Sequence, residues 1–188
     1  MNKRVVVFIC VLVFAISGVM AYDNMVTVSL DYGGLSSTKD LEDLLNFTGI
    51  QVGFYSYPNE HSSNGFYAQT SFQTMITDTP SNLFTGLLTN VLVGYSNRSE
   101  LGKMFDLLIG AGASYQKLDE EVLGGALTGS SSVIGIGASF ESSFLLSPKM
   151  TINGGVTAHI GMYDLNDRKV MEDIHLTVRL SLGVGFRF

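Results

Sequence analysis

The stretch that decides the fold is residues 174–188, which read IHLTVRLSLGVGFRF. Every even position in it is apolar, and the odd positions hold His, Thr, Arg, Ser or Gly. Successive side chains of a β-strand point to opposite faces, so a strand made from these residues has one apolar face and one polar face. This pattern is typical of a strand that crosses a membrane as part of a β-barrel.

The opening of the sequence is typical of a secretory signal peptide. Lys3 and Arg4 form a positively charged start, an apolar run follows from Val5 to Ile16, and Ala21 ends a suitable cleavage sequence. The apolar run is shorter than the ~20 residues that a membrane-spanning helix needs. We therefore expect a signal peptide over residues 1–21 and one barrel domain over residues 22–188.

Composition and charge argue against several classes of function. The one cysteine, Cys10, lies in the apolar run, so cleavage leaves no disulfide, cysteine metal ligand or cysteine nucleophile. Cleavage also moves the formal net charge from -6 to -8, and an acidic chain without a basic stripe is unsuited to nucleic-acid binding. High hydrophobicity (46%) without a further run long enough for a spanning helix favours spanning strands.

Seven further segments alternate and are separated by turn-forming residues. They cover residues 25–33, about 47–57, 66–76, about 85–96, 105–117, about 132–146 and about 152–162. Phe47 and Tyr57 fall out of phase in the second segment, as do Leu88 and Leu92 in the fourth. We predict an all-β fold, a single antiparallel transmembrane β-barrel of about eight strands.

An even number of strands places both termini on one side, which is the periplasm in bacterial barrels. Connections at roughly 34–46, 77–84, 118–131 and 164–173 are then extracellular, and those at 58–65, 97–104 and 147–149 are periplasmic. Aromatic residues near the strand ends predict girdles at the two membrane interfaces; they are Tyr32, Tyr57, Phe66, Phe84, Tyr95, Tyr115, Tyr163 and Phe188.

A water-soluble exported barrel such as a lipocalin is the main alternative, because it also alternates but is apolar inside. The chemistry of the polar face separates the two. A strand facing water carries Lys and Glu, whereas the polar positions here are mostly Gly, Ser, Thr, Asn and Gln. Such small residues suit the interior of a narrow barrel, so the sequence favours the membrane.

A few ionisable residues fall on the predicted inner face: Asp31, Asp106, Glu141, His159, Arg179 and Arg187. A buried charge is costly unless it is paired, so these groups are expected to pair with one another. Asp31, Glu141, His159 and Arg179 lie on neighbouring strands and are predicted to form a charge network in the lumen. A network that fills the lumen is favoured over a binding site.

Catalytic, cofactor and metal sites have little support in the sequence. Lipid-modifying barrels use a His and Ser pair near the outer rim, but His61 and Ser63 lie in a predicted periplasmic turn. The three histidines show no ligand spacing. We therefore expect no enzyme activity, no cofactor and no metal.

Over nearly all of the expected mature chain, the pattern resembles the small bacterial outer-membrane β-barrels of the OmpA transmembrane-domain, OmpX and OmpW type. The resemblance is carried by the signal peptide, the alternating segments and the ending LSLGVGFRF at residues 180–188. It implies location in the outer membrane, contact with its lipid, and recognition of Phe186 and Phe188 as a signal by the barrel assembly machinery.

Two functions follow from this resemblance. One is a structural or surface-interaction role, adhesin-like, in which short extracellular loops contact host or cell-surface ligands. The other is narrow passage of small or hydrophobic molecules across the outer membrane, as in OmpW. The interior of an eight-stranded barrel is only just wide enough for its own side chains, so a wide, porin-like channel is not expected.

Overall fold

The computed structural model describes residues 23–37, 45–59, 61–76, 84–122 and 126–188, which form one closed barrel. Its strands are β1 (Asp23–Ser37), β2 (Leu45–Tyr57), β3 (Asn64–Met75), β4 (Phe84–Glu100), β5 (Phe105–Val122), β6 (Ala126–Ser147), β7 (Met150–Asp164) and β8 (Lys169–Arg187). The predicted signal peptide lies outside the described residues. No helix in these ranges is long and apolar enough to cross a membrane.

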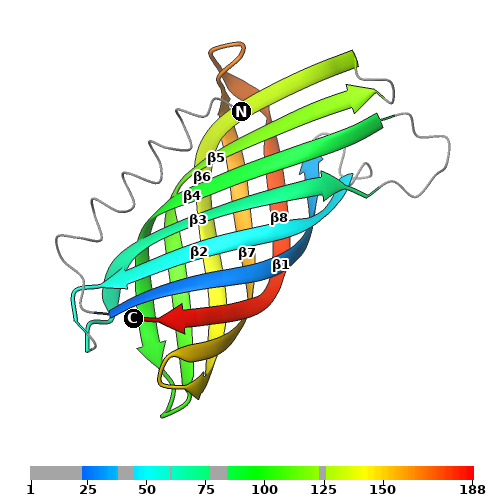
Figure 1. Cartoon of the computed structure of the whole chain (residues 1–188). Coiled ribbons are helices and arrows are strands. Elements are labelled where there is room, and N and C mark those ends of the chain that lie inside the picture. Colours follow the sequence, from blue (N-terminus) through cyan, green and yellow to red (C-terminus); the bar gives the residue numbers. More distant parts are fainter. Residues whose placement is uncertain (1–22, 38–44, 60, 77–83, 123–125) are drawn as a thin grey trace.

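Each strand pairs antiparallel with the next along the chain, and β8 closes the barrel against β1 (Figure 1). In this closing pair Leu182 lies opposite Leu30, so the alternating stretch identified in the sequence forms the barrel seam. Backbone hydrogen bonds of 3.1 and 3.0 Å join Asn24 and Phe188, which places the beginning of β1 beside the last residue. The predicted eight-stranded antiparallel barrel is confirmed.

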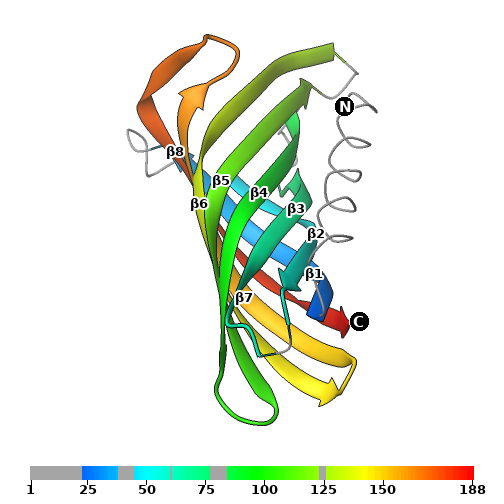
Figure 2. The same cartoon turned by 90° about the vertical axis from the view of Figure 1, so that its left-hand side faces the viewer.

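The two ends of the barrel differ in shape. The β2–β3, β4–β5 and β6–β7 turns lie at the end where β1 begins and β8 ends (Figure 1). At the other end the β5–β6 and β7–β8 hairpins reach furthest, which is also visible from the side (Figure 2). We refer to the first as the periplasmic end and to the second as the extracellular end, as in other bacterial barrels.

The two faces of the barrel wall differ in chemistry as predicted. In β8 the side chain of Leu182 is 67% exposed, whereas the neighbouring inward side chain of Arg179 is 1% exposed. The same division runs along β1, where Val28 and Leu30 face outward and Asp31 faces inward. The outer surface is therefore a belt of Leu, Ile, Val and Phe side chains, and polar groups line the lumen.

The structure explains the two segments that broke the alternation. Phe47, Tyr55 and Tyr57 of β2 point into the lumen together with Gln51, and the lumen-facing residues of β4 include Leu88 and Leu92. Both strands keep a regular two-residue period, but their inner face carries large apolar side chains among the polar ones. The prediction of Tyr57 as an interface aromatic is wrong, because this side chain is 2% exposed and fills the lumen.

Several connections are shorter than predicted because the strands run further. Most of the predicted connection 118–131 is paired strand, since β5 continues to Val122 and β6 begins at Ala126. The connections at 34–46, 97–104 and 164–173 are likewise shortened by β1, β2, β4 and β8. Backbone hydrogen bonds hold these strand ends, and their outward residues, such as Lys117, Asp119 and Ser130, are polar. Apolar alternation therefore does not reveal them.

Candidate functional site in the barrel lumen

Arg179 of β8 forms the centre of a buried cluster halfway along the lumen. Its Nη1 donates to Oδ2 of Asp31 on β1 at 3.3 Å and also to the hydroxyl of Ser71 on β3. Its Nη2 lies 2.6 Å from Nε2 of His159 on β7. Because β3 lies three strands from β8 around the wall, this one side chain ties together distant parts of the barrel.

Glu141 of β6 is bound separately. The hydroxyl of Tyr55 on β2 donates to its Oε2 at 2.8 Å, from the opposite wall of the barrel. The structure thus brings Asp31, His159 and Arg179 into direct contact and gives Glu141 a different partner.

Other polar side chains also cross the lumen. Gln69 of β3 donates to Thr157 of β7 at 3.4 Å, again between opposite walls. Gln116 of β5 donates to Thr177 of β8 at 2.7 Å and to Asn90 of β4 at 3.0 Å. Together with the contacts of Arg179 and Tyr55, these bonds bridge the lumen at several levels.

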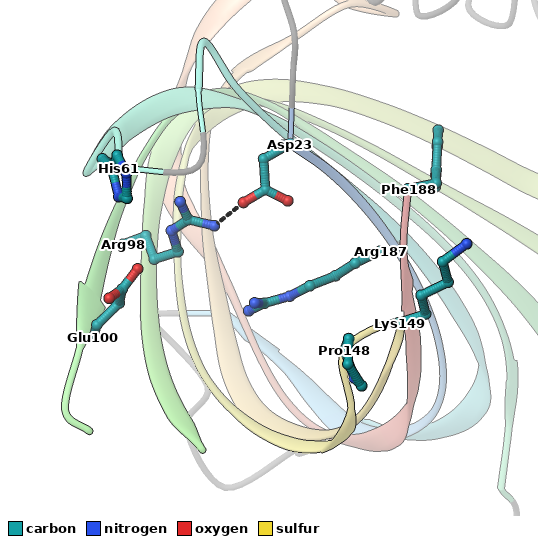
Figure 3. A pocket seen from close by; sticks show the side chains of 8 residues that line it. All are labelled: Asp23, His61, Arg98, Glu100, Pro148, Lys149, Arg187 and Phe188. Carbon is teal, nitrogen blue, oxygen red and sulfur yellow. Dashed lines mark hydrogen bonds and ion pairs between the residues drawn. The ribbon is translucent and has the colours of Figure 1, made fainter. Parts of the chain in front are cut away.

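A cavity of about 470 Å³ opens at the periplasmic end (Figure 3). Arg98 and Arg187 point into it from opposite sides, and Arg98 forms an ion pair with Asp23. Arg187 pairs with Asp106, which is the contact between the two remaining inward charges that the sequence identified. The Arg98 guanidinium also lies 4.4 Å from the centre of the Tyr57 ring. The cavity has cations and anions in near balance.

Two apolar clusters lie inside the lumen, one near each end. The periplasmic cluster consists of Met25, Tyr55, Tyr57, Tyr67, Leu92 and Leu108. The extracellular cluster consists of Leu35, Phe47 and Leu88, with Leu45, Met75 and Leu118 packed against it. Sequence reasoning did not identify these clusters. In the sequence, these clusters are marked by the apolar residues that break the alternation in β2 and β4 and by Leu108 in β5.

At the extracellular end, the hairpins form a polar surface that we call the hairpin rim, made of Lys117, Asp119, Ser130, Asp164 and Asn166. Lys117 pairs with Asp119, which also accepts a hydrogen bond of 2.8 Å from Ser130. The β7–β8 turn packs onto β6, because Asn166 donates to the Ser130 carbonyl at 2.5 Å. The rim is therefore held by side-chain contacts as well as by strand pairing.

Among the described residues no three His, Cys, Asp or Glu side chains are grouped so that they could hold a metal ion. His61 lies exposed in the β2–β3 turn at the periplasmic end, and His159 is held against Arg179.

Solved structures similar to this chain are small bacterial outer-membrane barrels. Neisserial surface protein A matches with a TM-score of 0.66 at 16% identity, over 88% of this chain and 97% of that chain. Ail, the attachment invasion locus protein of Yersinia pestis, matches with a TM-score of 0.59 at 17% identity, over 90% and 100%. OprG from Pseudomonas aeruginosa matches with a TM-score of 0.57 at 10% identity, over 90% and 97%. These likenesses establish the fold.

Sequence comparison identifies the family. No curated protein sequence matches this chain. The model of one protein family, described as Domain of unknown function (DUF2715), matches residues 10–188. The chain therefore belongs to the DUF2715 family and has the fold of the eight-stranded outer-membrane β-barrels.

Proposed function

We propose that this barrel is a structural and surface-interaction protein of the outer membrane that contacts its partners through the extracellular ends of its hairpins. The observation that carries the proposal is the bridged lumen. Side chains from opposite walls meet in the pairs Tyr55–Glu141 and Gln69–Thr157, and an apolar cluster lies near each end. A lumen filled in this way favours a stable plug over a path for solutes.

The hairpin rim supports the second half of the proposal. Its residues lie at the extracellular ends of β5, β6 and β7 and are held in place by the Lys117–Asp119 pair and by the packing of Asn166 on β6. A surface fixed in advance loses less conformational entropy on binding. The likeness in fold to a Neisserial surface protein and to an attachment invasion locus protein fits this role.

Charge suggests the chemistry of the partner. Ail has been solved with the heparin analogue sucrose octasulfate, which is strongly anionic. The present chain is acidic, with a formal net charge of -6 before any cleavage, so a sulfated sugar is a poor partner for it. We favour a neutral or basic partner at the cell surface.

Narrow passage of small or hydrophobic molecules is the second candidate function. It is favoured by several buried lumen atoms without hydrogen-bond partners in the described structure, including both amide atoms of Gln51 and of Asn153. Buried polar atoms of this kind are normally satisfied by water, and a continuous file of water would permit passage.

Planar-bilayer recording separates the two candidates. The purified barrel is expected to give no steady current, because side chains bridge the lumen and an apolar cluster lies near each of its ends. In parallel, bacteria displaying the barrel are expected to adhere to a cationic or neutral surface, and the double variant Lys117→Ala/Asp119→Ala is expected to reduce adhesion. Steady conductance by the parent, with adhesion unchanged in the variant, would favour passage.

We also propose that the barrel assembly machinery recognises the end of β8 through Phe186 and Phe188. Both side chains are exposed on the outer face of the barrel, and Phe188 is 68% exposed. Their accessibility supports a role in recognition.

A further inference from the structure

The cavity at the periplasmic end is lined by charged side chains that take no part in the cluster around Arg179 (Figure 3). Its volume of about 470 Å³ lies within the range of pockets that hold small molecules, roughly 300 to 1,000 Å³. The lining residues come from β1, the β2–β3 turn, the end of β4, the β6–β7 turn and the end of β8. The cavity is therefore formed by the closed barrel and does not exist in any single hairpin.

Arg187 has hydrogen-bond donors to spare in this cavity. Its guanidinium pairs with Asp106 on β5 through Nη2. A guanidinium carries five N–H donors, and the Nε and Nη1 of Arg187 form no hydrogen bond among the described residues. The side chain points into the cavity (Figure 3), so these donors are available to a ligand.

Lys149 lies beside Arg187 and adds a second cation to the same wall. The backbone N–H of Arg187 donates to the Lys149 carbonyl at 3.0 Å, which joins the end of β8 to the β6–β7 turn. The Lys149 side chain is exposed, lines the cavity and forms no ion pair within the described part of the chain. A guanidinium fork next to an ammonium group is well suited to a carboxylate ligand.

Glu100 lines the wall on the other side of the cavity (Figure 3). It lies at the end of β4, four strands from β8 around the barrel, and is exposed. No described residue forms an ion pair with it. Its direct cross-strand partner is Asp106, and like charges in such positions repel one another. Because Arg187 pairs with Asp106, Glu100 remains a place where an ammonium group from outside is attracted.

We propose that this cavity binds a short zwitterionic peptide, with its carboxylate on Arg187 and Lys149 and its ammonium group on Glu100. Charge balance selects this class of ligand. With His61 neutral, the lining residues and Asp106 supply three basic and three acidic groups, so the cavity favours neither a net anion nor a net cation. A peptide places its two charges far enough apart to meet an unpaired group on each wall.

The test is titration of the isotope-labelled barrel, refolded in detergent micelles, with dialanine at neutral pH, followed through backbone amide shifts. Saturable shifts are expected at Lys149 and Arg187. N-acetyl-dialanine lacks the ammonium group and dialanine amide lacks the carboxylate, so each is expected to bind about tenfold more weakly, because a charge-assisted hydrogen bond is lost. Shifts that do not saturate, or equal affinity for dialanine and the two blocked peptides, would overturn the proposal.

Two variants at exposed positions test the orientation of the peptide. Lys149→Gln is expected to weaken binding of dialanine about tenfold but not of dialanine amide, which has no carboxylate to lose. Glu100→Gln is expected to weaken binding of dialanine but not of N-acetyl-dialanine.

Lys103→Gln is the matched control, because Lys103 is exposed in the β4–β5 turn at the same end and does not line the cavity. This variant should bind dialanine as the parent does. A loss equal to that in Lys149→Gln would indicate a general effect of charge and would overturn the proposal. Weaker binding of dialanine amide by Lys149→Gln would overturn it as well.

Discussion

At the scale of single residues, removing the Arg179 side chain should lower the free energy of unfolding strongly. Arg179→Ala leaves the Asp31 carboxylate buried without its cation and removes the bridges to His159 and Ser71. We expect a loss of about 3 to 5 kcal/mol in the free energy of unfolding, and less if water enters the gap. Urea unfolding of the refolded barrel measures this loss.

The double variant Arg179→Ala/Asp31→Ala is the control for that prediction, because it removes both charges together. It should be more stable than Arg179→Ala alone. If Asp31→Ala lowers the free energy of unfolding further when it is added to Arg179→Ala, the two charges are not coupled.

Ala138 tests which face of β6 meets lipid. Its side chain is exposed on the outer face, next to Ala111 on β5 and Ala158 on β7. Ala138→Arg places a charge against the hydrocarbon and should cost about 2 to 4 kcal/mol at mid-membrane. Ala138→Leu also enlarges the side chain but adds no charge, so this variant should fold normally. Refolding yields in lipid vesicles compare the two, and equal yields would contradict the assigned face.

The sequence predicted which charges face the lumen but only some of their contacts. Alternation alone assigns Asp31, His159 and Arg179 to the inner face, and the neighbouring strands then bring them together. The partner of Glu141 could not be predicted in this way, because Tyr55 lies 86 residues away on the opposite wall. Such contacts depend on how far long side chains reach across a closed barrel.

At the scale of strands, the end of β8 should matter more for assembly than for stability. Phe188 is exposed at the periplasmic rim, so Phe188→Asp removes little packing. If the assembly machinery reads this residue, the variant should be secreted normally but inserted in smaller amounts. Leu101→Asp, an exposed apolar residue in the β4–β5 turn at the same end, is the matched control. Equal surface levels of all three proteins would count against recognition of Phe188.

The extracellular apolar cluster should contribute to stability through β2. Phe47 is fully buried between Leu35 and Leu88, and Phe47→Ala opens a cavity that should cost about 3 to 5 kcal/mol. Phe72→Ala, on the lipid face of the neighbouring β3, should cost less because lipid can fill the space. Denaturant midpoints of the two variants test this order, and a larger loss for Phe72→Ala would reverse the assigned faces.

The strands that the sequence described least well are those that fill the lumen. β1 and β8 follow a simple rule, apolar outside and polar inside, and their pattern was readable. β2 and β4 carry Phe47, Tyr57, Leu88 and Leu92 on the inner face, because a narrow barrel needs bulk as well as polarity inside. A search for alternating apolar residues fails at these positions, because it expects apolar side chains on the outer face alone.

At the scale of the whole molecule, the distribution of side chains is the reverse of that in a soluble barrel. The outer wall presents large apolar side chains on all eight strands, while the lumen holds ion pairs and amide–hydroxyl bonds. A soluble protein rarely exposes so large a contiguous apolar surface. The lipocalin alternative is therefore rejected on the arrangement of the side chains.

The most direct test of this account is the environment of alternate residues along β8. Val178, Leu180, Leu182 and Val184 are exposed in the belt, whereas Thr177 and Arg179 are buried in the lumen. Single cysteines at the four apolar positions, each carrying a nitroxide in lipid vesicles, should relax readily with oxygen and poorly with a water-soluble nickel complex. A nitroxide at Thr177 should be shielded from oxygen. Strong relaxation by the nickel complex at Leu180 and Leu182 would mean that this face meets water and would contradict the membrane-spanning barrel.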